Sequence, residues 1–165
     1  MAINSINGST ITAIEAASFD GTPLTKINVD GVCIWTGTGY FIFTLLNDGT
    51  YSVKAASGVD LPDYLEIPGT YNGVTVSKID KNGFNPHYPI ESGRPYLYKT
   101  KGLVINEGIT TIGDYAFVHL LDLEYVVLPK SLTSVGQEAF WDLQNLIAAY
   151  YRESSESWDE ISLGW

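Results

Sequence analysis

The chain has 165 residues, of which 45% are hydrophobic and 17% are charged, so it is long enough to bury a core and too apolar to be wholly disordered. Its formal net charge is -10. An acidic protein lacks the counterion release that dominates affinity for nucleic acid. We therefore expect neither nucleic acid nor anionic lipid as a partner. A single cysteine, Cys33, excludes a disulfide bond within the chain.

Targeting signals are missing from the start of the sequence. The first residues contain no basic side chain, and no apolar stretch typical of a signal peptide follows them. No segment approaches the roughly 18 apolar residues that a membrane helix needs. The sequence therefore predicts a protein that is made in a cytoplasm and is not inserted into a membrane.

The first third of the chain alternates short apolar runs with turn signals. The dipeptide Asp30-Gly31 and the tripeptide Asn47-Asp48-Gly49 are each flanked by β-branched and aromatic residues. Turn residues in this setting are typical of β-hairpins. We predict a β-rich N-terminal arm over residues 1–36 and a hairpin over residues 40–56.

The second half contains an internal repeat with a period of about 23 residues. A shift by one period superimposes residues 102–105 on residues 125–128. The same shift superimposes further pairs of apolar or small residues, namely Ile112 and Val135, Gly113 and Gly136, Ala116 and Ala139, Phe117 and Phe140, Leu120 and Leu143, and Leu123 and Leu146. Each unit has an apolar strand, a turn, a second apolar stretch and an amphipathic turn or short helix. A fixed period of this length is typical of a solenoid of stacked coils.

Imperfect copies flank the clear repeats. An earlier copy starts near Leu65 and reaches Phe84, which lies further from Phe117 than one period, so about ten residues are inserted after it. At the other end, residues 146–151 predict a further strand, and residues 158–163 predict a cap over the last coil. The predicted fold is α+β and β-rich. It is a short solenoid of about three 23-residue units with β-hairpins and a β-rich arm.

Residues 112–117 (Ile-Gly-Asp-Tyr-Ala-Phe) and 135–140 (Val-Gly-Gln-Glu-Ala-Phe) resemble the repeat unit of the BspA-type leucine-rich-repeat family. The resemblance covers residues 40–165, so the predicted domains are 1–36, an anchoring arm, and 40–165, a hairpin with a capped leucine-rich-repeat domain. It implies a binding scaffold and not an enzyme. Familiar members of this family are bacterial surface adhesins.

The segment from residue 27 to residue 35 is similar to strand-turn-Trp modules in head and tail proteins of phages that infect gut bacteria. With the unprocessed start, this similarity favours a virion structural protein, such as a head fibre, decoration or tail element. Such a protein would assemble with other virion proteins or with itself, for example as a trimer, through residues 1–36. It would present the repeats for assembly or for attachment to a host protein or glycan. The alternative is a bacterial cell-surface or secreted BspA-like adhesin that binds host protein or glycan.

Residues that could support catalysis or metal binding are few. Cys33 and the two distant histidines, His87 and His119, do not have the matched spacing of a metal site. His119 also aligns with Asp142, which marks it as a position of the scaffold. Carboxylates cluster over residues 153–160, but a solvated polar surface explains them without a glycosidase-like pair. We expect no catalytic residue, no metal and no cofactor.

Alternation along the strands predicts one binding surface. Successive strand residues point to opposite faces of a sheet, so the residues expected in the core are Leu103, Ile105, Val126 and Leu128. The residues expected to point outward are Val104, Tyr125, Val127 and Tyr150. Such an apolar and tyrosine-bearing stripe suits contacts with protein or sugar. It is equally explained as a surface covered by the chain's own arm or by a neighbouring subunit.

The insertion before residue 101 offers a second candidate surface. It carries aromatic and guanidinium groups on a Pro-rich segment, at Tyr88, Arg94, Tyr96 and Tyr98. Residues of these types often dominate interface energy. They could instead pack the insertion onto the edge of the solenoid.

Overall fold

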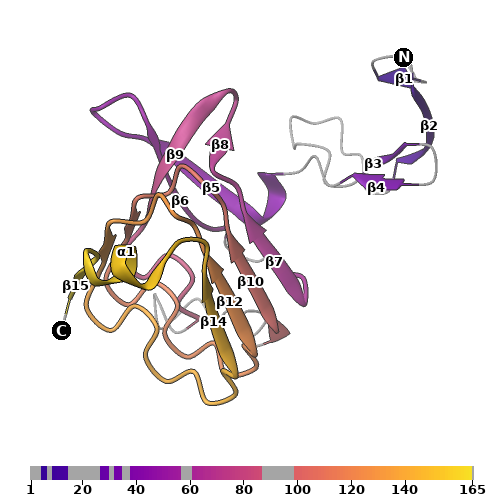
Figure 1. The fold of residues 1–165 in the computed structure, drawn as a ribbon. Coiled ribbons are helices and arrows are strands. Elements are labelled where there is room, and N and C mark those ends of the chain that lie inside the picture. Colours follow the sequence, from indigo (N-terminus) through magenta and orange to yellow (C-terminus); the bar gives the residue numbers. More distant parts are fainter. Residues whose placement is uncertain are drawn as a thin grey trace. The chain divides into compact units, whose positions relative to one another are not determined.

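The computed structural model describes residues 5–6, 9–14, 27–29, 32–34, 38–56, 61–86 and 99–164. The chain divides into two compact units, Met1–Phe41 and Ile42–Trp165 (Figure 1). The first unit contains an antiparallel sheet of four strands in chain order, β1 (Ser5–Ile6), β2 (Ser9–Ile14), β3 (Ile27–Val29) and β4 (Val32–Ile34). A short 3-10 helix, η1 (Thr38–Tyr40), follows. The pairing of β3 with β4 agrees with the hairpin predicted around residues 30–31, which themselves lie outside the described residues.

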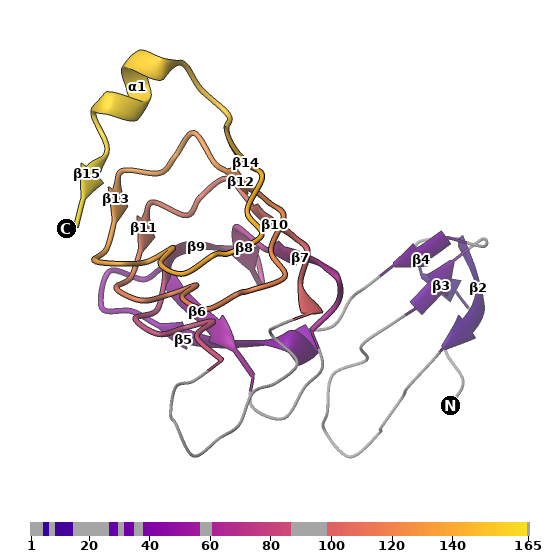
Figure 2. The same ribbon diagram turned by 90° about the horizontal axis from the view of Figure 1, so that it is seen from below.

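The second unit contains two sheets. Four parallel strands form what we call the main sheet, in the order β14 (Ala148–Tyr151), β12 (Tyr125–Leu128), β10 (Gly102–Ile105) and β7 (Tyr64–Ile67). The other sheet has the order β15 (Ser162–Leu163), β13 (Ser134–Val135), β11 (Thr111–Ile112), β9 (Val74–Ile79), β6 (Tyr51–Ala55) and β5 (Phe41–Leu45). A short strand, β8 (Thr70–Tyr71), pairs antiparallel with β9. Figure 2 shows the resulting coils as nested loops that pass from one sheet to the other.

Strand register confirms the predicted period. Gly102 pairs with Tyr125 on the main sheet, and Ile112 pairs with Val135 on the other sheet, so both pairs are separated by one period. Between the first coil and the next, the paired residues lie further apart in the sequence: Leu65 pairs with Leu103, and Ile79 pairs with Ile112. This sequence separation is greater on the main sheet than on the other sheet. The additional residues form β8 and its turn, which lie between β7 and β9. The solenoid is therefore regular after its first coil.

The core between the sheets consists of aliphatic rows and one aromatic row. The four strand residues predicted to point inward are at most 2% exposed. Phe84, Phe117 and Phe140 stack on one another, with ring centroids 5.3 and 5.2 Å apart. The same arrangement of buried side chains is thus repeated from coil to coil, as the period of the sequence requires.

The sequence predicts either a turn or a short helix for residues 114–121 and 137–143. The structure has turns in both segments. Tyr115 and His119 have left-handed backbones with φ of 57° and 60°, and the equivalent Glu138 and Asp142 have φ of 49° and 56°. Left-handed residues cannot continue a right-handed helix. Within the described ranges, the α-helix is α1 (Ser155–Asp159), whose N-cap Ser154 accepts a hydrogen bond from the backbone N–H of Ser157.

Glycine follows the second strand of each regular coil because the coils approach closely there. A Cβ on Gly113 would lie 2.5 Å from the backbone nitrogen of Lys81, and a Cβ on Gly136 would lie 2.5 Å from the backbone nitrogen of Asp114. Real Cβ atoms are not found at such distances from backbone, so these positions require glycine. The Ile-Gly and Val-Gly pairs of the repeat are thus a packing requirement.

The C-terminal segment continues the stack. Within residues 158–163, for which the sequence predicts a cap, Ser162 and Leu163 pair in parallel with Ser134 and Val135 of β13. Helix α1 connects β14 to this last strand. No helix in the described part of the chain is long and apolar enough to cross a membrane.

Candidate binding face

The outward side of the main sheet, which we call the outer face, is made of two rows of side chains that run across the four strands. The first row is Tyr64, Gly102, Tyr125 and Ala148, and the second row is Glu66, Val104, Val127 and Tyr150. All four residues predicted to point outward are found on it. Val104, Tyr125 and Val127 are half-buried, whereas 58% of Tyr150 is exposed.

Tyr64 is a residue of the outer face that the sequence interpretation missed. It is 65% exposed and lies beside Gly102 at the start of β7. The sequence had identified Leu65 as the start of an earlier copy. Extending the same alternation one residue towards the N-terminus would have placed Tyr64 on the outer face.

The rings of Tyr64 and Tyr125 meet above Gly102. Their centroids are 6.3 Å apart and their planes differ by 27°. A Cβ on Gly102 would lie 2.5 Å from both Cζ and the hydroxyl oxygen of Tyr125, and 2.8 Å from Cδ1 of Tyr64. Both rings therefore lean across the middle strand and occupy the space that a side chain of β10 would fill. We call this pair of rings the aromatic platform.

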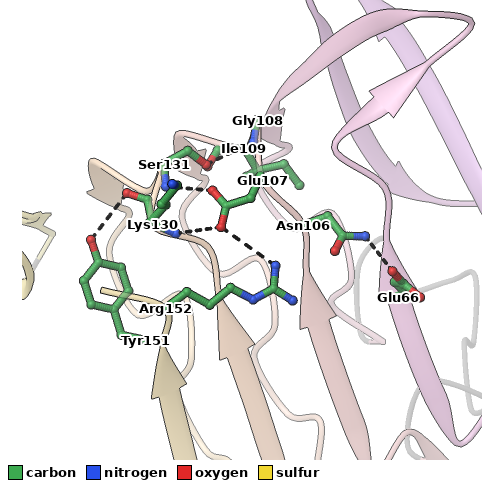
Figure 3. A network of polar contacts seen from close by, with 9 residues as sticks. All are labelled: Glu66, Asn106, Glu107, Gly108, Ile109, Lys130, Ser131, Tyr151 and Arg152. Atoms are coloured by element: carbon green, nitrogen blue, oxygen red, sulfur yellow. Dashed lines mark hydrogen bonds and ion pairs between the residues drawn. The ribbon is translucent and has the colours of Figure 1, made fainter. Parts of the chain in front are cut away.

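Polar contacts fix the turns at the carboxyl ends of the main strands (Figure 3). The carboxylate of Glu107 accepts hydrogen bonds from the backbone N–H groups of Lys130 and Ser131 at 3.1 and 3.2 Å. Arg152 forms an ion pair with the same carboxylate, with 3.8 Å between Nη1 and Oε1. The side-chain amide of Asn106 donates a hydrogen bond of 2.8 Å to Glu66. An ion pair and an amide–carboxylate pair thus lie at the carboxyl ends of the main strands.

Comparison with known proteins gives two informative matches to this architecture. A crystal structure of a leucine rich repeat protein from T. pallidum superposes with a TM-score of 0.56 and 17% sequence identity, over 69% of this chain and 48% of that chain. Residues 96–162 match the family model described as BspA type leucine rich repeat region, in 6 copies. The repeat domain is a leucine-rich-repeat solenoid. The match also supports the predicted BspA-type assignment of its repeats.

Two further solved structures show weaker likeness to the chain. A leucine rich cell surface protein from Faecalibacterium prausnitzii A2-165 has a TM-score of 0.39 and 19% identity, over 74% of this chain and 40% of that chain. A leucine-rich repeat protein from Eubacterium ventriosum has a TM-score of 0.38 and 19% identity, over 75% of this chain and 25% of that chain. The chain spans about half the length of the T. pallidum protein and less of the other two. A comparison with curated proteins gives no match.

An exposed isoleucine precedes the last strand of the main sheet. The residues before the first three main strands are charged, namely Asp63, Lys101 and Glu124, and backbone hydrogen bonds connect them from coil to coil. Ile147 takes the equivalent place before β14 and is 83% exposed. In the last coil, the position before the main strand thus carries an aliphatic side chain, where the earlier coils carry a charged one.

His119 contacts Asp142, with which the repeat had aligned it. Its Nδ1 lies 2.8 Å from a carboxylate oxygen of Asp142, and the ring of Trp141 packs against it edge-on at 5.1 Å. Hydrogen bonds from Gln144 and then from His119 lower the pKa of Asp142. This contact joins two left-handed turn positions of successive coils, which is a scaffold role.

The remaining candidates form no reactive cluster. Glu153, Glu156, Asp159 and Glu160 are all exposed around α1, so they lie on an open surface. Among the described residues no group of three or more His, Cys, Asp and Glu side chains could hold a metal ion. The second candidate surface (Tyr88, Arg94, Tyr96 and Tyr98) and His87 lie outside the described residues.

Proposed function

We propose that the solenoid is a non-enzymatic recognition module of a bacterial cell-surface or secreted protein, and that it binds a host protein or glycan on its outer face. The observation that carries the proposal is the set of tyrosines on rigid parallel strands, of which Tyr64 and Tyr150 are more than half exposed. Tyrosine offers a large, amphipathic contact area at a low cost in conformational entropy. A repeat scaffold keeps the spacing of such side chains constant.

The BspA type repeat match supports the cell-surface setting of this proposal. Surface adhesins are the familiar bacterial proteins that these repeats resemble. Leucine-rich-repeat scaffolds of this kind are typically binding proteins and not enzymes.

A triple variant tests the proposal. We expect Tyr64→Ala/Tyr125→Ala/Tyr150→Ala to lower binding of the full chain to mucin-coated or matrix-coated surfaces by at least about tenfold, because exposed aromatic anchors carry much of an interface's energy. Binding is measured by biolayer interferometry, with circular dichroism as the check on folding. Trp141→Ala is the matched control, since Trp141 is 54% exposed but lies on a turn and not on the main sheet. Equal binding by the triple variant and the parent chain would contradict the proposal.

A virion structural protein is the second candidate function. The observation that favours it is the first unit, a four-stranded antiparallel sheet separate from the solenoid. A small sheet of this kind could anchor the repeats to a particle or to other copies of the chain.

The mass of the protein in solution tests this second candidate. We expect the full chain to form a trimer or larger oligomer and the chain without residues 1–36 to be monomeric, because the anchoring contacts would lie in the arm. Light scattering coupled to size exclusion measures both masses, and circular dichroism checks that the truncated chain keeps its β-sheet content. A monomer in both forms would exclude self-assembly through the arm and leave the adhesin proposal in place.

A further inference from the structure

We infer that the outer face binds a neutral oligosaccharide. This inference rests on the proposed function, because it names the ligand class of the same face. It is carried by the size of the face, the arrangement of its aromatic rings and the pairing of its charges.

The size of the outer face favours a small ligand. Four strands of four residues each form the main sheet. At about 4.8 Å between strands and about 3.3 Å per residue, they offer an area of about 250 Å². A folded protein partner usually covers about 800 Å² on each side of a stable interface. The outer face is therefore small for a folded partner and well suited to a short, extended chain.

The aromatic platform favours a sugar as that chain. A pyranose ring presents a flat array of C–H groups on one side and hydroxyl groups around its rim. The Tyr64 ring, which is 65% exposed and stacks on Tyr125 over Gly102, offers an aromatic surface on which such C–H groups can pack. Glu66, in the second row, and Asn106, just past the carboxyl end of β10, are hydrogen-bonded at 2.8 Å and retain acceptor and donor capacity for the hydroxyl groups of a sugar chain that extends along the strands from the platform.

The charges around the outer face favour a neutral sugar. Arg152 is paired with Glu107, and Lys101 lies between Asp63 and Glu124 in the row of residues before the strands. A sulfated, phosphorylated or sialylated ligand would need cations that are not already offset by carboxylates. The chain as a whole has a net charge of -10, which also opposes an anionic ligand.

Titration of the ¹⁵N-labelled full chain with cellotetraose, chitotetraose and xylotetraose tests the inference. We expect at least one of these neutral sugars to shift the amide resonances of β7, β10 and β12, and tetragalacturonate, an anionic sugar, to leave them unchanged. Tyr64→Ala is expected to weaken the binding at least about fivefold, as for loss of a stacked ring. Trp141→Ala is expected to leave it unchanged.

A second variant keeps both tyrosines and alters only the platform. In Gly102→Ala the three atoms nearest the new Cβ belong to tyrosine side chains, namely Cζ and the hydroxyl oxygen of Tyr125 and Cδ1 of the exposed Tyr64, so the fold should persist while the rings move apart. We expect the affinity for the neutral sugar to fall at least about threefold with little change in the midpoint of urea unfolding. Unchanged affinity in Gly102→Ala would show that the platform does not hold the ligand.

The outcomes separate this inference from the proposed function. If none of the neutral sugars binds, or if tetragalacturonate binds more tightly, the neutral-sugar inference is overturned. If the triple tyrosine variant nevertheless loses binding to the coated surfaces, the outer face remains the recognition surface and its ligand is a protein or a charged glycan. If the triple variant retains that binding, the proposed function fails together with the inference.

Discussion

Replacement of Gly136 by alanine is expected to lower the free energy of unfolding by about 3–5 kcal/mol, at or above the upper end of ordinary overpacking costs. The new Cβ would lie 2.5 Å from the backbone nitrogen of Asp114 and 2.7 Å from the carbonyl carbon of Gly113. Neither atom belongs to a flexible side chain. The two coils must therefore separate locally to accommodate one methyl group.

Separation of the coils would disturb the hydrogen bonds that join them. The backbone N–H of Gly136 donates to the carbonyl oxygen of Ile112 at 2.8 Å, and the backbone N–H of Gln137 donates to the carboxylate of Asp114 at 3.1 Å. Hydrogen bonds from the backbone of Gln137 and then from Lys81 lower the pKa of Asp114, so this carboxylate is charged at neutral pH. Weakening of the bond to Ile112 adds most to the cost, because Ile112 is fully buried, whereas the bond to Asp114 is exposed and contributes less.

Urea unfolding of Gly136→Ala beside Gly102→Ala measures this effect against a matched control. Both variants add the same methyl group to a glycine at an inter-coil contact, but at Gly102 the three nearest atoms belong to tyrosine side chains and not to backbone. We expect Gly102→Ala to change stability by less than about 1 kcal/mol. Similar losses in the two variants would mean that the close approach of the coils at Gly136 does not control stability.

The fold was predictable from the sequence because coil stacking imposes one spacing on many side chains at once. Leu103 and Val126 must be one full period apart to lie side by side, and so must Phe117 and Phe140. Several pairs of similar residues separated by the same number of positions therefore identify which strands pair in parallel, without any knowledge of strand propensity. In-out alternation then follows from the pleat of each strand.

The first coil was harder to predict because its spacing differs. The hairpin of β8 and β9 adds residues within the coil, and the insertion after Phe84 adds more, so Leu65 lies well over one period before its partner Leu103. Tyr64 was overlooked for this reason, although it is the most exposed of the tyrosines on the outer face. The meeting of its ring with that of Tyr125 was not predictable either, since side-chain tilt across strands depends on the empty space at Gly102.

The turns show a different limit of sequence interpretation. Tyr115 and Glu138 have left-handed backbones, although neither residue type favours that conformation. An amphipathic pattern such as residues 114–121 fits a short helix or a compact turn equally well. The backbone is held in the turn by contacts between coils, for example the hydrogen bond from the N–H of Tyr115 to the carbonyl oxygen of Gln137. Such contacts are not visible in a local pattern.

Phe117→Ala is expected to lower the free energy of unfolding by about 3–5 kcal/mol, the usual cost of removing a fully buried phenylalanine. Phe117 is inaccessible to solvent and stacks on Phe84 at 5.3 Å and on Phe140 at 5.2 Å. Its loss would leave a cavity in the middle of the aromatic row, with coils on both sides that cannot collapse into it. Phe140→Ala is the matched control, because Phe140 is only half-buried and a smaller cavity would form. We expect it to cost about half as much in the same urea titration. An equal loss of unfolding free energy in the two variants would contradict the expectation that the central ring of the row contributes most to stability.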